Sequence, residues 1–164
     1  MAEKYSLTLL AMHARVMPSI VLMDREIAAK APEKNLLILI LHEEEDALYA
    51  KEFGRLLQET HPQGVAGYRI QTQTAPYEKI KTASGAGAFY LLPAQTPKIL
   101  QAVAWGIEQE RITFSYDEQA VKEGVLASLS IGRKAVPYLN TDTLTKSKIR
   151  FNPTLISVAK RYPQ

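Results

Sequence analysis

An unbroken apolar run, Leu36 to Leu41, constrains the fold of this chain more than any other feature of its sequence. It lies within Asn35 to His42, a segment of strand length. A strand that covers a core with one face alternates apolar and polar residues, whereas a continuous Leu/Ile run is typical of a strand buried on both faces of a parallel sheet. The run is far below the roughly 20 residues that a membrane-spanning helix requires. We therefore expect an α/β protein with helices on both sides of a sheet.

The segments after this strand alternate between helical and extended patterns. We expect helices at 44–59, 76–82, 96–105 and 117–123, and strands at 68–72, 88–92 and 112–115. Such alternation implies parallel strands joined by right-handed crossovers. The extended segments 125–130 and 134–139 are separated by a brief turn and predict a hairpin. The expected fold is a three-layer α/β sandwich with a mostly parallel sheet and a C-terminal antiparallel hairpin, in a single domain covering residues 1–164.

The two ends of the chain are expected to be helical. Residues 3–29 have helical apolar spacing, interrupted by Pro18, which lacks a backbone donor and should kink or split the helix. Thr96 is expected to cap the helix that begins there. The closing residues predict a helix at 141–146, an exposed strand or turn at 149–151 and a last helix at 153–162.

Charge and composition limit the function classes. The net charge of +3 is too small to indicate a nucleic-acid partner. It is uneven, because residues 133–164 hold seven basic residues and one acidic residue, a net +6, which leaves −3 for residues 1–132. We predict a partner-binding surface at Arg133, Lys134, Lys148 and Arg150, with scattered solvated charges as the alternative. The chain contains no cysteine, which excludes disulfides, thiolate catalysis and cysteine-based metal sites.

Signatures of catalysis are missing from the sequence. It holds no glycine-rich phosphate loop, nucleophile elbow or paired-histidine helix. The glycine-containing segment 84–87 precedes a strand, so we interpret it as a structural turn. We expect no enzyme activity, no cofactor and no metal site.

The carboxyl ends of the predicted strands are the best candidate for a ligand site. Ligands of open parallel sheets bind beyond these ends, which here carry His42, Glu43, Ser115, Tyr116 and Asp117. We predict that these five residues bind a ligand. The alternative is that the acidic residues only favour and cap helix starts. A further hypothesis makes His42, with Glu43 or Asp117, the acid and base of an enzyme.

The last third of the chain resembles the closing pattern of the YfiR-like family. The resemblance lies in segments 112–115, 137–140, 149–152 and 155–159, and in the glycine at position 124. It implies a small periplasmic α/β protein that represses an inner-membrane diguanylate cyclase by contacting its periplasmic part. It also implies structural roles for Asn140, as a helix cap, and for Phe151, beneath the final helix. The chain departs from the family at Met17-Pro18, where a Trp-Pro pair is usual, and in having no cysteine.

A second resemblance, carried by residues 124–128 and the C-terminal pattern, is to one lobe of ABC-type solute-binding proteins. The leading hypothesis is thus a regulatory module that contacts a membrane sensor or the periplasmic domain of a diguanylate cyclase. The alternative is a single-lobe solute-binding protein that recognises a small molecule at the strand ends. A homodimer is left open. We expect a periplasmic location, with a signal sequence preceding this segment, or a cytoplasmic one if Met1 is the native start.

Overall fold

The computed structural model describes residues 5–164, in which helices and strands alternate as the sequence predicts. The helices are α1 (Leu7–Val21), α2 (Ile27–Lys30), α3 (Ala47–Thr60), α4 (Thr96–Gln109), α5 (Thr141–Lys146) and α6 (Pro153–Val158). The strands are β1 (Asn35–His42), β2 (Arg69–Pro76), β3 (Ala88–Leu91), β4 (Ile112–Ser115), β5 (Ala127–Ile131), β6 (Ala135–Asn140) and β7 (Lys160–Tyr162). Short 3-10 helices are η1 (Pro32–Lys34), η2 (Glu44–Asp46), η3 (Tyr77–Thr82) and η4 (Glu118–Glu123).

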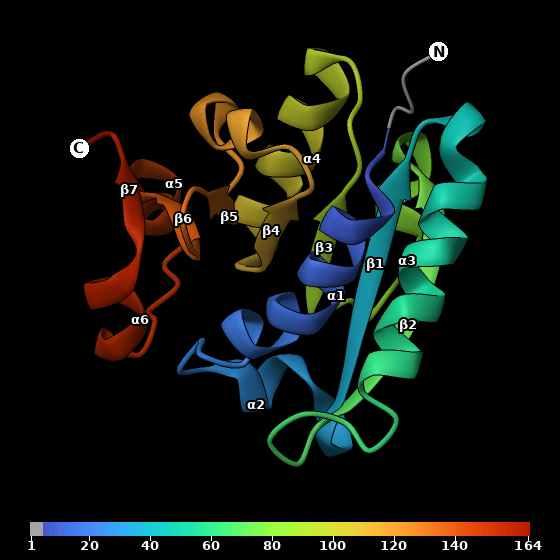
Figure 1. Cartoon of the computed structure of the whole chain (residues 1–164), viewed down its shortest axis with the longest axis horizontal. Coiled ribbons are helices and arrows are strands. Elements are labelled where there is room, and N and C mark those ends of the chain that lie inside the picture. The colour runs from blue at the N-terminus through green and yellow to red at the C-terminus, as the bar shows by residue number, and fades with distance from the viewer. Residues whose placement is uncertain (1–4) are drawn as a thin grey trace.

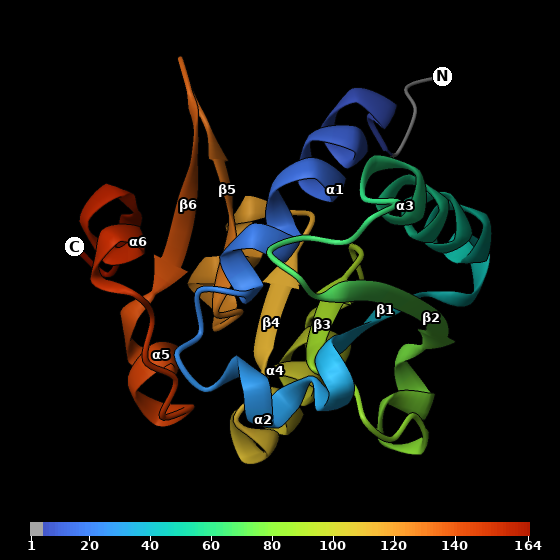
Figure 2. The same ribbon diagram turned by 90° about the horizontal axis from the view of Figure 1, so that it is seen from below.

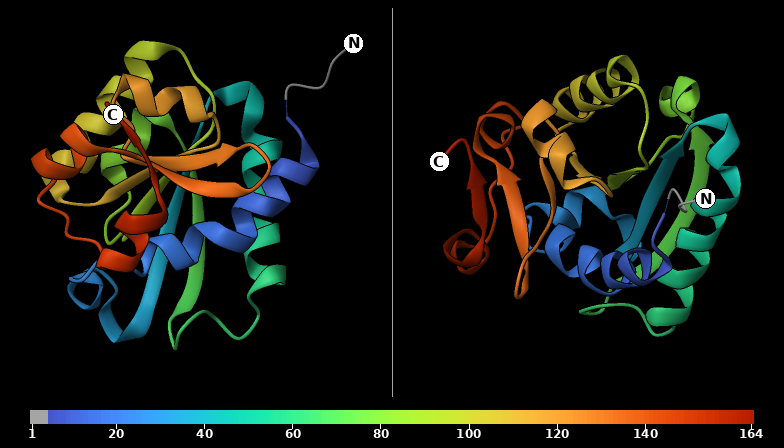
Figure 3. Two further views of the ribbon diagram at one scale, coloured as in Figure 1. Left: turned by 60° about the vertical axis from the view of Figure 1, so that its left-hand side comes forward. Right: turned by 45° about the horizontal axis from the view of Figure 1, so that its top comes forward.

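The strands among residues 5–164 form one seven-stranded sheet in the order β2-β1-β3-β4-β5-β6-β7. All neighbouring pairs are parallel except β5 and β6, which form the predicted antiparallel hairpin. The fold class predicted from the sequence is therefore confirmed. Figures 2 and 3 show the hairpin extending as an arm from the rest of the sheet.

Strand β1 is buried on both faces, as its Leu/Ile run requires. Leu36, Ile38 and Ile40 join the core cluster on one side, together with residues of α1 and α3. Leu39 and Leu41 join a second cluster on the other side, together with residues of α4 and η3. The sheet thus separates two helical layers (Figures 1 and 3).

The N-terminal helix is shorter than predicted. Pro18 lies inside α1, which continues past it to Val21, and the predicted residues 3 and 4 fall outside the described part of the chain. The helix then stops because the backbone pairs with the C-terminal segment. Asp24 forms an isolated antiparallel bridge with Phe151, flanked by a bond from the Asn152 N–H to the Met23 carbonyl at 2.9 Å.

The same pairing corrects the prediction for residues 149–151. Ile149 and Phe151 are 4% and 5% exposed, so two of the three side chains of this segment are buried, and Phe151 shares a core cluster with Leu155 of α6. The last helix ends at Val158, and residues 160–162 pair with β6 as strand β7. No helix in the described part of the chain is both long and apolar enough to cross a membrane.

Two smaller predictions also need correction. Thr96 does not cap α4, because Gln95 holds that position and the Thr96 hydroxyl instead donates to Glu123 at 3.2 Å. Strand β2 continues to Pro76, so Thr72 and Gln73 lie within the strand and not at its end.

Candidate functional site

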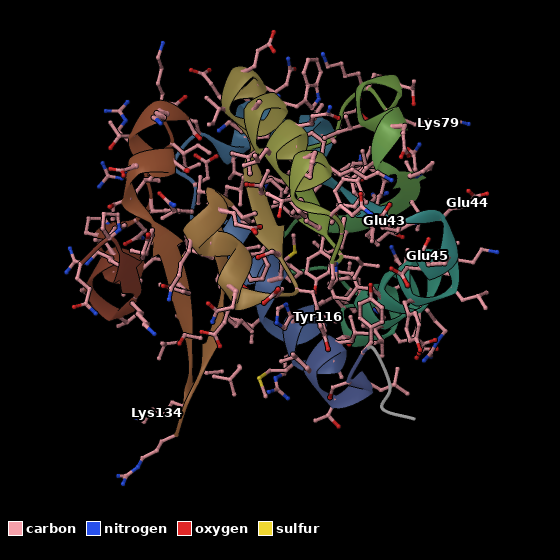
Figure 4. The ribbon with its side chains drawn as sticks, turned by 90° about the horizontal axis from the view of Figure 1, so that it is seen from above. Glu43, Glu44, Glu45, Lys79, Tyr116 and Lys134 are labelled. Atoms are coloured by element: carbon pink, nitrogen blue, oxygen red, sulfur yellow. The ribbon has the colours of Figure 1, made fainter. Side chains whose placement is uncertain are left out.

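The strand ends that were predicted to form a site do meet at one edge of the sheet. The parallel register aligns Leu41 of β1 with Leu91 of β3, and Leu91 with Ser115 of β4. Figure 4 looks onto this edge and shows Glu43 and Tyr116 on it. The five predicted ligand residues nevertheless divide into two groups with different surroundings.

His42 and Glu43 belong to a polar network at the end of β1. The Glu43 carboxylate forms an ion pair with Lys98 of α4, and Lys98 also pairs with Glu78 at 2.8 Å. Hydrogen bonds to these two carboxylates raise the pKa of Lys98, and the bond to Lys98 lowers the pKa of Glu78. The His42 ring nitrogen Nδ1 lies 2.7 Å from the Glu43 carbonyl oxygen. These contacts fasten α4 and η3 to the sheet edge.

Ser115 and Asp117 are also engaged in local structure. The Ser115 hydroxyl donates to the Asp117 carbonyl at 2.7 Å, and the Ser115 carbonyl accepts from the Ser128 hydroxyl at 2.6 Å. One Asp117 carboxylate oxygen accepts from the Gln119 N–H at 2.9 Å and caps η4. The capping role that the sequence analysis offered as an alternative is therefore present for Asp117.

A cavity of about 330 Å³ opens beside this second group, between α1, the end of β4 and the hairpin. We call it the rim cavity. Its lining residues are Leu9, His13, Pro93, Tyr116, Asp117, Glu118, Leu129 and Ile131. It therefore combines apolar walls with an imidazole, a phenol and two carboxylates, and its volume lies within the range of small-molecule sites.

His13 is the most unusual residue of the rim cavity. Its side chain is fully buried, and Nδ1 lies 2.9 Å from the hydroxyl oxygen of Tyr90. Its other ring nitrogen, Nε2, has no hydrogen-bond partner among the described residues. Burial lowers the pKa of His13 to about 4, so the imidazole is neutral at pH 7. A buried polar atom of this kind costs about 1–3 kcal/mol unless a partner satisfies it.

Hydrogen-bond counting assigns the tautomer of His13. If the Tyr90 hydroxyl donates to Nδ1, only the Nε2 hydrogen is left without a partner. If Nδ1 donated instead, both the phenol hydrogen and Nε2 would be left without one. The first arrangement satisfies more groups, which makes Nε2 a buried hydrogen-bond donor without a partner among the described residues.

Tyr116 and two acidic residues complete the cavity. The Tyr116 ring lies against His13, with ring centroids 5.7 Å apart, and its hydroxyl accepts from the Ser6 N–H at 2.8 Å. Neither Asp117 nor Glu118 forms an ion pair with another residue of the described chain. The cavity thus carries negative charge that no described basic side chain neutralises.

Sequence reasoning missed His13 as a site residue. Its spacing from Leu10 and Met17 follows the buried face of α1, so it resembles an ordinary core position. The sequence feature that could have identified it is a histidine on the buried face of a helix, because a buried imidazole has two nitrogens that need hydrogen-bond partners. Its contact with Tyr90 joins residues 77 positions apart, which no local pattern reveals.

The four predicted partner residues lie in two places. Arg133 and Lys134 are exposed in the turn of the hairpin, where Figure 4 shows Lys134 projecting from its tip. Lys148 and Arg150 instead line a separate hollow with Glu26 and Glu110, and Arg150 pairs with Glu26 at 3.3 Å. Within residues 5–164, no three histidine or acidic side chains are grouped as a metal site would require.

Comparisons with known proteins identify the fold. No protein-family model matches the chain, and no curated protein sequence matches it. The structure is similar to a conserved domain protein from Vibrio cholerae O1 biovar El Tor, with a TM-score of 0.59 and 12% identity over 93% of this chain and 59% of that chain. It is also similar to an ABC domain from Streptococcus pneumoniae in complex with L-Trp, with a TM-score of 0.54 and 12% identity over 87% of this chain and 61% of that chain.

The chain therefore spans about three-fifths of each of these two structures. At 12% identity, the likeness shows the fold alone. It supports the resemblance to ABC-type solute-binding proteins and has no bearing on the resemblance to the YfiR-like family. We conclude that the chain has the α/β fold of these two structures.

Proposed function

We propose that this protein binds a small organic molecule in the rim cavity and catalyses no reaction. The observation that carries the proposal is that His13 lines the rim cavity and that its buried Nε2, a hydrogen-bond donor, has no partner among the described residues. A ligand oxygen would satisfy it. The fold also supports ligand binding in the rim cavity, since ligands of open parallel sheets bind at the carboxyl ends of strands.

The lining of the rim cavity favours an amine with an apolar body. Leu9, Leu129 and Ile131 offer apolar contact, and Tyr116 offers an aromatic ring. The carboxylates of Asp117 and Glu118 favour a positive charge. The ligand that fits this chemistry has an ammonium group at one end, an apolar or aromatic centre, and an oxygen that accepts from His13.

Three related probes test these features by isothermal titration calorimetry. Tyramine carries the ammonium group, the ring and a phenol oxygen, phenethylamine lacks the oxygen, and 4-hydroxyphenylacetate replaces the ammonium group with a carboxylate. We expect tyramine to bind about tenfold more tightly than either of the others, a difference of ~1.4 kcal/mol. L-tryptophan, which the Streptococcus pneumoniae domain holds, is a fourth probe.

Two variants assign the binding to the rim cavity. Asp117→Asn/Glu118→Gln keeps an oxygen for the η4 cap and should abolish the preference for tyramine over 4-hydroxyphenylacetate. The matched control, Glu33→Gln/Asp142→Asn, removes the same charge from exposed positions that do not line the cavity and should leave the preference unchanged. If none of the four probes gives saturable heat, or if the control behaves like the cavity variant, the proposal is wrong.

A periplasmic regulator that acts by protein contact, as the YfiR-like resemblance implies, is a second candidate. The observation that favours it is the free positive charge of the C-terminal part. Six basic residues of this region pair with no carboxylate in the described chain, namely Arg133, Lys134, Lys146, Lys148, Lys160 and Arg161. They are all exposed and suit an acidic partner such as the periplasmic domain of a membrane sensor or diguanylate cyclase.

Co-purification from native membranes tests this second candidate. The wild-type protein should recover a sensor or cyclase subunit, and Lys146→Glu/Lys148→Glu should recover less of it. Fractionation of the native host tests the periplasmic location. Recovery of the protein from the cytoplasm alone would contradict the regulatory role.

A further inference from the structure

Opposite charges lie on opposite sides of Tyr116. Arg133 and Lys134 project from the hairpin turn, and Glu44 and Glu45 lie in η2, just before α3. Figure 4 shows Lys134 on one side of Tyr116 and the two glutamates on the other. All four charged side chains are exposed, and none forms an ion pair with a residue of the described chain.

The described chain also carries exposed apolar side chains in the neighbourhood of these charges. Among residues 5–164, the large hydrophobic residues that are most exposed are Leu7, Leu48, Leu100, Ile131 and Val158, at 55%, 80%, 48%, 44% and 57%. Three of them either follow closely in sequence a residue that bonds Tyr116 or Tyr5, or line the rim cavity with Tyr116; the two tyrosine rings have centroids 5.1 Å apart. Leu7 follows Ser6, which donates to the Tyr116 hydroxyl. Leu48 lies two residues after Asp46, which accepts from the Tyr5 hydroxyl at 3.0 Å, and Ile131 lines the rim cavity with Tyr116.

We propose that a second copy of this chain docks on this surface. We call it the docking face and define it by its apolar and charged members, Leu7, Glu44, Glu45, Leu48, Tyr116, Ile131, Arg133 and Lys134. In a two-fold dimer both subunits use the same patch. If the hairpin turn of the first copy contacts the glutamates of the second, the hairpin turn of the second copy also contacts the glutamates of the first. A two-fold axis across Tyr116 sets the basic hairpin turn of each copy against the two glutamates of the other.

Charge complementarity identifies the occupant. A patch that carries a basic group at one end and an acidic group at the other is complementary to itself in a two-fold arrangement. An acidic partner would leave Glu44 and Glu45 facing like charges, and a basic partner would do the same to Arg133 and Lys134. A second copy satisfies both ends at once and covers Leu7, Leu48 and Ile131.

Charge reversal followed by mixing tests the dimer, measured by sedimentation velocity. The wild type should dimerise, and both Arg133→Glu/Lys134→Glu and Glu44→Lys/Glu45→Lys should be monomeric, because like charges then meet at both ends of the interface. An equimolar mixture of the two variants should dimerise again, since each altered end meets its opposite charge. Glu44→Gln/Glu45→Gln, which only removes charge, should weaken the wild-type dimer without abolishing the fold.

The matched control is Lys146→Glu/Lys148→Glu, which changes the charge by the same amount at exposed positions outside the docking face. It should dimerise like the wild type. The proposal is overturned if the wild type is monomeric up to about 100 µM, if the reversed variants dimerise as the wild type does, or if their mixture stays monomeric. None of these measurements depends on a ligand in the rim cavity, so the two proposals fail separately.

Discussion

His13 makes the stability of this protein depend on pH. Burial holds its pKa at about 4, below the ordinary value of 6.5. Because the unfolded chain takes up the proton at a higher pH than the folded chain, the contribution is complete above about pH 6.5 and is lost as pH falls toward about 4. The full loss is on the order of 3 kcal/mol.

Urea unfolding at pH 7 and pH 4.5 measures this loss. The wild type should lose more stability between the two pH values than His13→Phe/Tyr90→Phe, which replaces both hydrogen-bonding partners with rings of similar shape. Other groups titrate in both proteins and cancel in the comparison. Equal losses in the two proteins would show that His13 does not carry the effect.

Gly106 marks a close approach between α4 and the sheet. A Cβ atom there would lie 2.7 Å from Thr113 Cγ2, so Gly106→Ala should destabilise the fold by about 1–3 kcal/mol although alanine favours helices. Thr113→Ser removes that methyl group and keeps the hydroxyl that accepts from the Leu126 N–H at 3.0 Å. The double variant should therefore unfold at a higher urea concentration than Gly106→Ala alone. A lower one would contradict the steric explanation.

At the scale of elements, Asn140 joins α5 to η4. Its side-chain oxygen accepts from the Thr143 N–H at 2.9 Å, and its amide donates to the Val121 carbonyl at 2.7 Å. Asn140→Ala removes a helix cap and one of two hydrogen bonds to the Val121 carbonyl, which still accepts from the Gly124 N–H at 3.1 Å, and it should cost about 2 kcal/mol. Asn152 caps α6 from an exposed position, so Asn152→Ala should cost about 1 kcal/mol or less. Chemical denaturation measures the free energy of unfolding of both variants. A larger loss for Asn152→Ala than for Asn140→Ala would contradict this account.

The elements that the sequence predicted well are those whose own residues determine them. The Leu/Ile run of β1 and the turn between β5 and β6 are local patterns, and the capping role of Asn140 is a local contact. Strand β7 was missed because Lys160 to Tyr162 has no strand pattern of its own and is extended only because it pairs with β6. The same distinction between local patterns and long-range packing applies to the residues of the site. Tyr116 and Asp117 follow from strand topology, whereas His13 reaches the rim cavity through the packing of α1.

At the scale of the whole molecule, the segment after α1 and the segment before α6 are joined by the bridge between Asp24 and Phe151. The Arg25 N–H donates to the Arg150 carbonyl at 2.9 Å, and the Asn152 N–H donates to the Met23 carbonyl at the same distance. We expect the amides of Arg25 and Asn152 to exchange hydrogen only on global unfolding, at rates close to that of Leu39 in β1. Hydrogen exchange measured by NMR checks this, and much faster exchange at Arg25 and Asn152 would show that the C-terminal segment opens separately.

Strands β4 and β5 pair over a short length, and their register consists of the pair Phe114 and Ala127. Side-chain hydroxyls reinforce it, since Thr113 accepts from Leu126 and Ser128 donates to Ser115. The hairpin beyond it supplies one wall of the rim cavity and carries Arg133 and Lys134 at its turn. The hairpin therefore belongs to both the rim cavity and the docking face. If the filled cavity and the second copy favour the same position of the hairpin, each raises the affinity for the other by the same factor.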